Sequence, residues 1–162
     1  MADTKERLAT AQWVLERNLG WITAADAKVS VVTTINLAML GGLAAAYSQA
    51  SAKTCWVYLF SSLSAAFVII SLACAAISVL PRLDGPKHSL LFFGRIAEMG
   101  LNEYQQSFKQ SPDEDFLDDL TEQIHRNAEI AKEKHRWVKN AMALSFLSVI
   151  PWVVSIALLI NA

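Results

Sequence analysis

Three long stretches of the chain contain no charged residue: 29–52, 54–81 and 140–162, with Lys53 between the first two. A helix rises about 1.5 Å per residue, so about 20 apolar residues cross the roughly 30 Å hydrocarbon layer of a bilayer. Each stretch is long enough to do so. We therefore predict an all-α integral membrane protein with three transmembrane helices, over residues 29–49, 55–80 and 138–160.

Residues 1–28 carry a pattern of their own. Leu8, Leu15, Ile22 and Val29 recur every seven residues, which predicts an amphipathic helix. No proline separates this segment from the first span, so one helix is expected to run through both. A repeat this short favours packing within the chain over a coiled coil with a partner.

Residues 82–137 are predicted to form a helical insert between the second and third spans. Phe93, Leu101 and Phe108 follow a helical spacing within residues 89–110. Ser111-Pro112-Asp113-Glu114 reads as a capping box with proline at the first helical position. A helix is expected from residue 112 to about 150, with a kink at Pro151, whose ring removes a backbone hydrogen bond.

Composition supports a single membrane domain over residues 1–162. Of the residues, 54% are hydrophobic and 18% are charged, and the net charge is −1. Near-neutral charge argues against binding a nucleic acid polymer. No nucleophile, P-loop, dinucleotide or metal-ligand motif is present, so neither an enzyme nor a cofactor is predicted. Cys55 and Cys74 are interpreted as packing residues.

The distribution of positive charge predicts the orientation. Thirteen of the fourteen Lys and Arg residues lie in residues 1–28 and 82–139, and Lys53 alone lies in the loop between the first two spans. The positive-inside rule therefore places the N-terminus and the insert in the cytoplasm. Membrane lipids are expected to contact the spans and the basic residues next to them.

A few polar residues lie inside the predicted spans. Ser64, Ser71 and Ser78 recur every seven residues and mark one helix face, where small side chains permit close helix packing. The same row fits the lining of a pore, and contacts within one chain or between chains are both open. The candidates for packing or gating are Asp26, Asn36, Ser64, Ser71, Ser78 and Pro151.

A second group of residues, near the cytoplasmic boundary, suits a small phosphodiester. Arginine binds phosphate through a planar fork, an aromatic ring stacks on a base, and an amide reads its edge. The alternative is that the aromatic residues are core and that Asp26 pairs with Lys28 or Arg82. The ligand-binding candidates are Lys28, Arg82, Ser89, Phe92, Arg95, Tyr104, Asn127 and Lys134.

Several short motifs occur in a fixed order between the spans. Ala25-Asp26-x-Lys28 opens the first span, and Pro81-Arg82 closes the second. Ser89-x-x-Phe92-Phe93-Gly94 and Tyr104 follow in the insert, and a long helix from Leu120 to Lys134 enters the last span. In this order of motifs the chain resembles, over approximately residues 10–160, the membrane effectors of the Pycsar anti-phage systems of bacteria.

This resemblance implies an inner-membrane protein that senses a cyclic nucleotide made on infection, then assembles into a homo-oligomer and impairs the membrane. Cyclic UMP or cyclic CMP is the favoured ligand, and a cyclic oligonucleotide is the alternative. Two other functions fit the residues. One is a structural or adaptor membrane protein whose cytoplasmic helices bind a protein, and the other is a constitutive ion-conducting pore.

Overall fold

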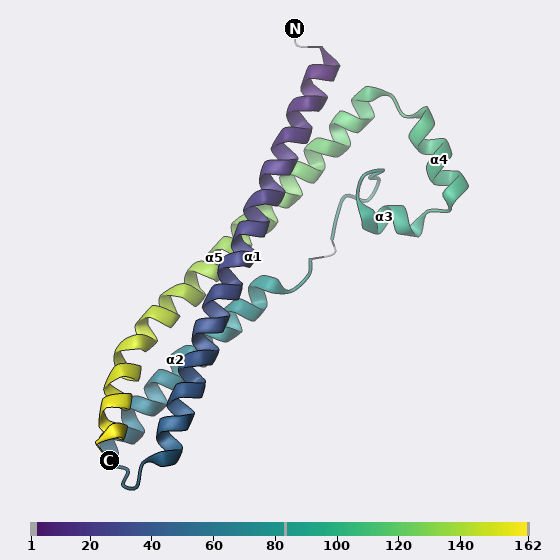
Figure 1. The fold of residues 1–162 in the computed structure, drawn as a ribbon. Coiled ribbons are helices and arrows are strands. Elements are labelled where there is room, and N and C mark those ends of the chain that lie inside the picture. Colours follow the sequence, from purple (N-terminus) through teal and green to yellow (C-terminus); the bar gives the residue numbers. More distant parts are fainter. Residues whose placement is uncertain (1–2, 83, 162) are drawn as a thin grey trace. The chain divides into compact units, whose positions relative to one another are not determined.

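The computed structural model describes residues 3–82 and 84–161. All regular structure in these residues is helical, as Figure 1 shows. The helices are α1 (Thr4–Gln49), α2 (Cys55–Val79), α3 (Phe93–Glu98), α4 (Leu101–Gln110) and α5 (Asp113–Ile160). Three of them, α1, α2 and α5, are long and apolar enough to cross a membrane. The predictions of an all-α fold and of three such helices are therefore confirmed.

The chain divides into two compact units. The span unit comprises the described part of residues 25–80 and 134–162, and the insert unit comprises the described part of residues 1–24 and 81–133. Helices α1 and α5 contribute to both, because neither ends at the boundary between the units. Each unit is described below by itself.

In the span unit, α1 and α5 run parallel and α2 runs antiparallel to both. Asn36 on α1 bonds Ser71 on α2 and Ser145 on α5. Ser61 at the start of α2 bonds Ser155 near the end of α5, and Ser78 at the end of α2 bonds Lys134 in the middle of α5. The turn between α1 and α2 is short because Thr54 caps α2, accepting a hydrogen bond from the Val57 amide. A tight antiparallel hairpin followed by a returning helix results.

The polarity of the span unit is inverted relative to a water-soluble bundle. Its inner face buries polar side chains among apolar ones such as Val57 and Val68, and Asn36, Ser71 and Ser155 are all 0% exposed. Its outer face presents large apolar ones, including Phe146 at 69% and Ile150 at 70%. Water would penalise this arrangement, since exposed apolar area costs about 25 cal/mol per Å². Lipid does not penalise exposed apolar side chains. Small residues between the helices are also typical of membrane bundles.

The buried face of α2 follows a heptad rule. Its inward positions alternate between three- and four-residue steps, a spacing that lets side chains interlock between neighbouring helices. The predicted face of Ser64, Ser71 and Ser78 is part of this row and is fully buried. The members of the row are Val57, Ser61, Ser64, Val68, Ser71, Ala75 and Ser78.

In the insert unit, the start of α1 lies beside the start of α5. The Thr4 hydroxyl donates to Glu114 over 3.1 Å, and the Asn18 amide donates to the Ile124 carbonyl over 3.1 Å. Asn18 is 3% exposed. The expected continuity of residues 4–28 with the first span is confirmed, because α1 is one helix from Thr4 to Gln49.

Helical spacing in residues 89–110 does not produce one helix. The chain forms the shorter helices α3 and α4, with Met99 and Gly100 in extended conformations between them. Residues 89–92 lie outside the helices, and within them the Ser89 hydroxyl accepts hydrogen bonds from the Leu91 and Phe92 amides.

The predicted capping box at Ser111 is wrong. The Ser111 hydroxyl donates backward to the Ser107 carbonyl at the end of α4, over 3.0 Å. The Pro112 carbonyl instead accepts the first amides of α5, from Asp115 and Phe116. Helix α5 then continues with Pro151 inside it as far as Ile160, the last residue of the predicted third span.

Candidate functional site

A row of hydrogen-bonded polar side chains crosses the middle of the span unit. Asn36 is its centre: its amide donates to Ser71 Oγ over 2.8 Å, and its carbonyl oxygen accepts from Ser145 Oγ over 2.8 Å. Ser71 Oγ donates in turn to the Ala141 carbonyl over 2.7 Å. One asparagine therefore joins all three helices within a single chain.

The row continues toward the α1–α2 turn. Ser61 and Ser155 share a hydrogen bond of 2.6 Å, and Ser148 donates to the Ser145 carbonyl over 2.6 Å. We call this set the polar seam. It consists of Asn36, Ser61, Ser64, Ser71, Ser145, Ser148 and Ser155, all buried.

Ser64 differs from the rest of the polar seam. It is 1% exposed, and its hydroxyl has no hydrogen-bond partner among the described residues. A serine hydroxyl inside a helix usually has a carbonyl or a neighbouring side chain to bond. Ser64 is therefore a point where the closed bundle leaves a polar group unsatisfied.

A charged pair lies at the other end of the span unit. The Lys134 ammonium donates to Asp26 Oδ1 over 2.5 Å, and the Lys134 carbonyl accepts from the Ser78 hydroxyl over 3.4 Å. Lys134 is 8% exposed and the Asp26 side chain 43%. Asp26 thus pairs with Lys134, and the expected alternatives Lys28 and Arg82 are not its partners.

A loop of the insert unit is fastened to α5. Asp119 Oδ2 accepts from the Leu90 and Leu91 amides over 2.8 and 3.2 Å. Gln123 donates to Ser89 Oγ over 3.1 Å, and the Tyr104 hydroxyl donates to the Leu90 carbonyl over 3.3 Å. Ser89 is 2% exposed. These contacts fix the backbone of residues 89–92.

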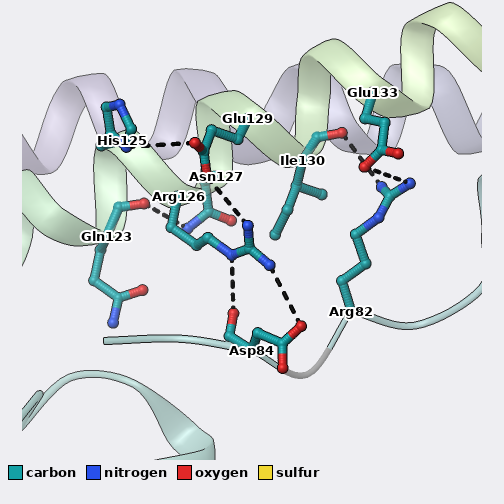
Figure 2. A network of polar contacts seen from close by, with 9 residues as sticks. All are labelled: Arg82, Asp84, Gln123, His125, Arg126, Asn127, Glu129, Ile130 and Glu133. Atoms are coloured by element: carbon teal, nitrogen blue, oxygen red, sulfur yellow. Dashed lines mark hydrogen bonds and ion pairs between the residues drawn. The ribbon is translucent and has the colours of Figure 1, made fainter. Parts of the chain in front are cut away.

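Figure 2 shows the neighbouring contacts of α5 with the chain entering this loop. Arg126 donates to the Asp84 carbonyl over 3.0 Å and pairs with the carboxylates of Asp84 and Glu129. Arg82 pairs with Glu133 over 3.1 Å. Asn127 donates to the Gln123 carbonyl one turn earlier. The arginines here already bind protein groups.

A pocket of about 500 Å³ opens between residues 84–87 and α3, and Phe92 of the loop also lines it. Phe92 is packed against bare backbone in it, since a Cβ on Gly85 or Gly94 would approach its ring to 2.5 or 2.7 Å. Arg95 pairs with Glu98 over 3.1 Å, at the exposed end of α3. The lining residues are Asp84, Gly85, Pro86, Lys87, Phe92, Gly94, Arg95 and Glu98.

The ligand-binding candidates fall at several places. Phe92 and Arg95 line the same pocket, and Ser89 and Tyr104 hold the loop beside it. The insert unit also holds Arg82, which bonds the Ile130 carbonyl of α5, and Asn127, which lies on α5 and bonds the Gln123 carbonyl. In the span unit Lys28 is exposed, and Lys134 is bonded to Asp26.

Two residues that contribute to the pocket and its loop were not predicted from the sequence. Lys87 lines the pocket, but a single basic residue in a turn-rich loop carries no distinctive signal. Asp119 anchors the loop, but it lies in an acidic run that is equally typical of a helix start. Neither position follows from spacing along the chain.

Comparison with known proteins finds one family. Residues 10–161 match a family model described as the Pycsar effector protein domain. No curated protein and no solved structure matches the chain.

Proposed function

The chain belongs to the Pycsar effector family, and from this premise we propose that it senses a cyclic nucleotide and, once activated, oligomerises and impairs the bacterial inner membrane. Membership implies an anti-phage effector role, and effectors of this family are associated with cyclic nucleotide signalling and with the membrane. The proposal is that the effector stops growth of the infected cell by acting on its own bilayer.

The inverted polarity of the span unit is the observation that carries the membrane part of the proposal. Apolar side chains such as Phe146 and Ile150 face outward, while Asn36 and Ser71 are enclosed. A bilayer is the solvent that favours both features. The excess of Lys and Arg outside the spans supports a cytoplasmic N-terminus and a cytoplasmic insert.

We assign the messenger to the pocket beside α3. Its volume of about 500 Å³ lies within the range of small-molecule sites. Arg95 would exchange its contact with Glu98 for the ligand phosphate, with Lys87 as a second cation. Phe92 supplies an aromatic surface for the base. Cyclic UMP or cyclic CMP is favoured, and a cyclic oligonucleotide is the alternative.

The remaining candidates take supporting roles in this proposal. Ser89 and Tyr104 keep the loop in the conformation that forms the pocket, through their bonds to residues 90–92. Arg82 joins the adjoining chain to α5 through Glu133, and Asn127 bonds the Gln123 carbonyl within α5. Lys28 and Lys134 are closer in sequence to the spans and are assigned to the membrane side rather than to the ligand.

Helix α5 is the proposed connection between ligand and spans. It is one helix from Asp113, near the residues that anchor the loop, to Ile160 at the end of the last apolar run. The messenger alters the spans only to the extent that it binds two packings of the chain with unequal affinity.

Thermal unfolding of the purified protein in detergent tests this proposal. Cyclic UMP or cyclic CMP is expected to raise the melting temperature of the wild type, because a ligand that binds only the folded state stabilises it. Arg95→Ala and Phe92→Leu should abolish the shift, while Lys109→Ala, on the exposed end of α4, should keep it. If no cyclic nucleotide or cyclic oligonucleotide shifts the transition, the sensor function is wrong.

An adaptor role is the second candidate, because the insert unit exposes large apolar side chains to solvent. Trp13 is 59% exposed, Phe93 63% and Leu101 71%. Such side chains are common at protein interfaces. This function predicts a cytosolic protein that co-purifies with the chain and requires no ligand.

A further inference from the structure

We propose that the polar seam lines the aqueous path through which the activated effector makes the membrane permeable. This inference rests on the proposed function, because it concerns how that function is executed. It assigns a role to side chains that in the described structure only hold α1, α2 and α5 together.

The two surfaces of the span helices differ in their affinity for water. Outward residues such as Val31, Ile69 and Phe146 are large, apolar and more than half exposed, so turning them toward water is unfavourable. The polar seam is the opposite case, because water can replace each hydrogen bond that Asn36 or a serine loses. Any water-filled path built from these spans therefore has the polar seam as its wall.

Ser64 is the independent sign that the polar seam is suited to water. Its hydroxyl is buried at 1% exposure and lacks a partner, although every other serine of the polar seam bonds a side chain or a carbonyl. A hydroxyl in that position is satisfied as soon as a water molecule reaches it. Hydration of the polar seam thus removes a defect of the dry bundle.

Apolar layers close the polar seam at both ends in the described structure. Toward the Asp26–Lys134 pair, Val29, Cys74 and Val138 belong to one buried cluster. Toward the α1–α2 turn, Leu43, Val57 and Leu159 form another. Conduction requires these layers to separate, and hydrophobic constrictions of this kind close channels by excluding water.

Cysteine accessibility tests the proposal. The parent carries Cys55→Ala and Cys74→Ala, which remove both native thiols. Ser64→Cys and Ser148→Cys place a thiol in the polar seam, and Ala66→Cys places one at nearly the same depth on the exposed face of α2. Each variant is reconstituted in sealed liposomes. Ion leak and modification by a charged, water-soluble methanethiosulfonate are measured with and without cyclic UMP and cyclic CMP.

Leak accompanied by rapid modification of Ser64→Cys and Ser148→Cys, with Ala66→Cys unmodified, is the expected result, because a thiol reacts only where water reaches it. Leak with unmodified seam cysteines would overturn the polar seam as the path and leave the proposed function standing. Equal modification of Ala66→Cys would indicate general bilayer disruption and would also overturn it. Leak and seam modification without any nucleotide would support the path and reject the messenger. Absence of leak in every condition would contradict both.

Discussion

The Lys134 ammonium and the Asp26 carboxylate are joined by a 2.5 Å contact across α5 and α1. They are 108 residues apart in sequence. Lys134 is 8% exposed, so its largely desolvated ammonium is compensated by this contact. The carbonyl of the same residue accepts from Ser78 on α2, which brings all three span helices to this point.

Breaking this pair should destabilise the span unit. Asp26→Asn leaves the Lys134 charge buried beside a neutral side chain. We expect the free energy of unfolding to fall by about 1–3 kcal/mol, which is less than for a fully buried pair because the Asp26 side chain is 43% exposed. Lys28→Gln, two residues along α1 and exposed, is the matched control. Denaturant unfolding in detergent measures both. Equal stability of Asp26→Asn and wild type would show that the pair contributes nothing.

Asn36 is expected to determine the association of the three span helices. Asn36→Leu keeps the side-chain size but removes the hydrogen bonds to Ser71 and from Ser145. Because hydrogen bonds between helices in membranes are individually weak, we expect the free energy of unfolding to fall by about 1–2 kcal/mol. Ile35→Leu, on the exposed neighbouring position, should change stability little. A stability gain in Asn36→Leu would mean that apolar packing exceeds the hydrogen bonds.

Asp119 is predicted to hold the loop that forms the pocket. Asp119→Ala removes the acceptor of the Leu90 amide, so hydrogen exchange at this amide should become about 10- to 100-fold faster, while the Leu91 amide keeps Ser89 Oγ as an acceptor and should change less. Asp118→Ala, the exposed neighbour, is the control and should leave their exchange unchanged. Unchanged exchange in Asp119→Ala would indicate that Ser89 and Tyr104 suffice to order the loop.

The native cysteines provide a test of orientation. Cys55 is exposed at the start of α2, and Cys74 is buried further along it. With the N-terminus cytoplasmic, a membrane-impermeant maleimide should modify Cys55 in intact spheroplasts and should leave Cys74 unmodified. Ser51→Cys, exposed in the turn, provides a second position. If Cys55 and the introduced Ser51→Cys thiol are modified only after the membrane is permeabilised, the N-terminus lies on the outside and the predicted topology is reversed.

The sequence predicted the features of the fold that depend on local patterns. Charge-free runs identified the three apolar helices, and the seven-residue recurrence of Ser64, Ser71 and Ser78 identified the face of α2 that is buried. These predictions succeeded because helical periodicity and the solvent preference of each side chain are encoded within one segment.

Features that depend on distant residues were not predictable in this way. Charge alone did not choose Lys134 rather than Lys28 or Arg82 as the partner of Asp26, because that choice depends on the register of α1 against α5. Ser111 had the composition of a helix start, but its hydroxyl found an acceptor in the helix before it. The pocket joins residues 84–87 to Phe92 and α3. The side chains of α5 that contact these segments, Arg126 at Asp84 and Asp119 at the Leu90 amide, are distant from them in sequence.

The membrane potential of living bacteria gives the most direct test of the central claim, that a cyclic nucleotide makes this membrane effector impair the bilayer. The fluorescence of a potential-sensitive dye is followed in cells that express the protein, while a co-expressed cyclase that produces cyclic UMP or cyclic CMP is induced. Collapse of the potential is expected with the wild-type chain and not with Arg95→Ala. A stable potential in wild-type cells that accumulate the cyclic nucleotide would contradict the account.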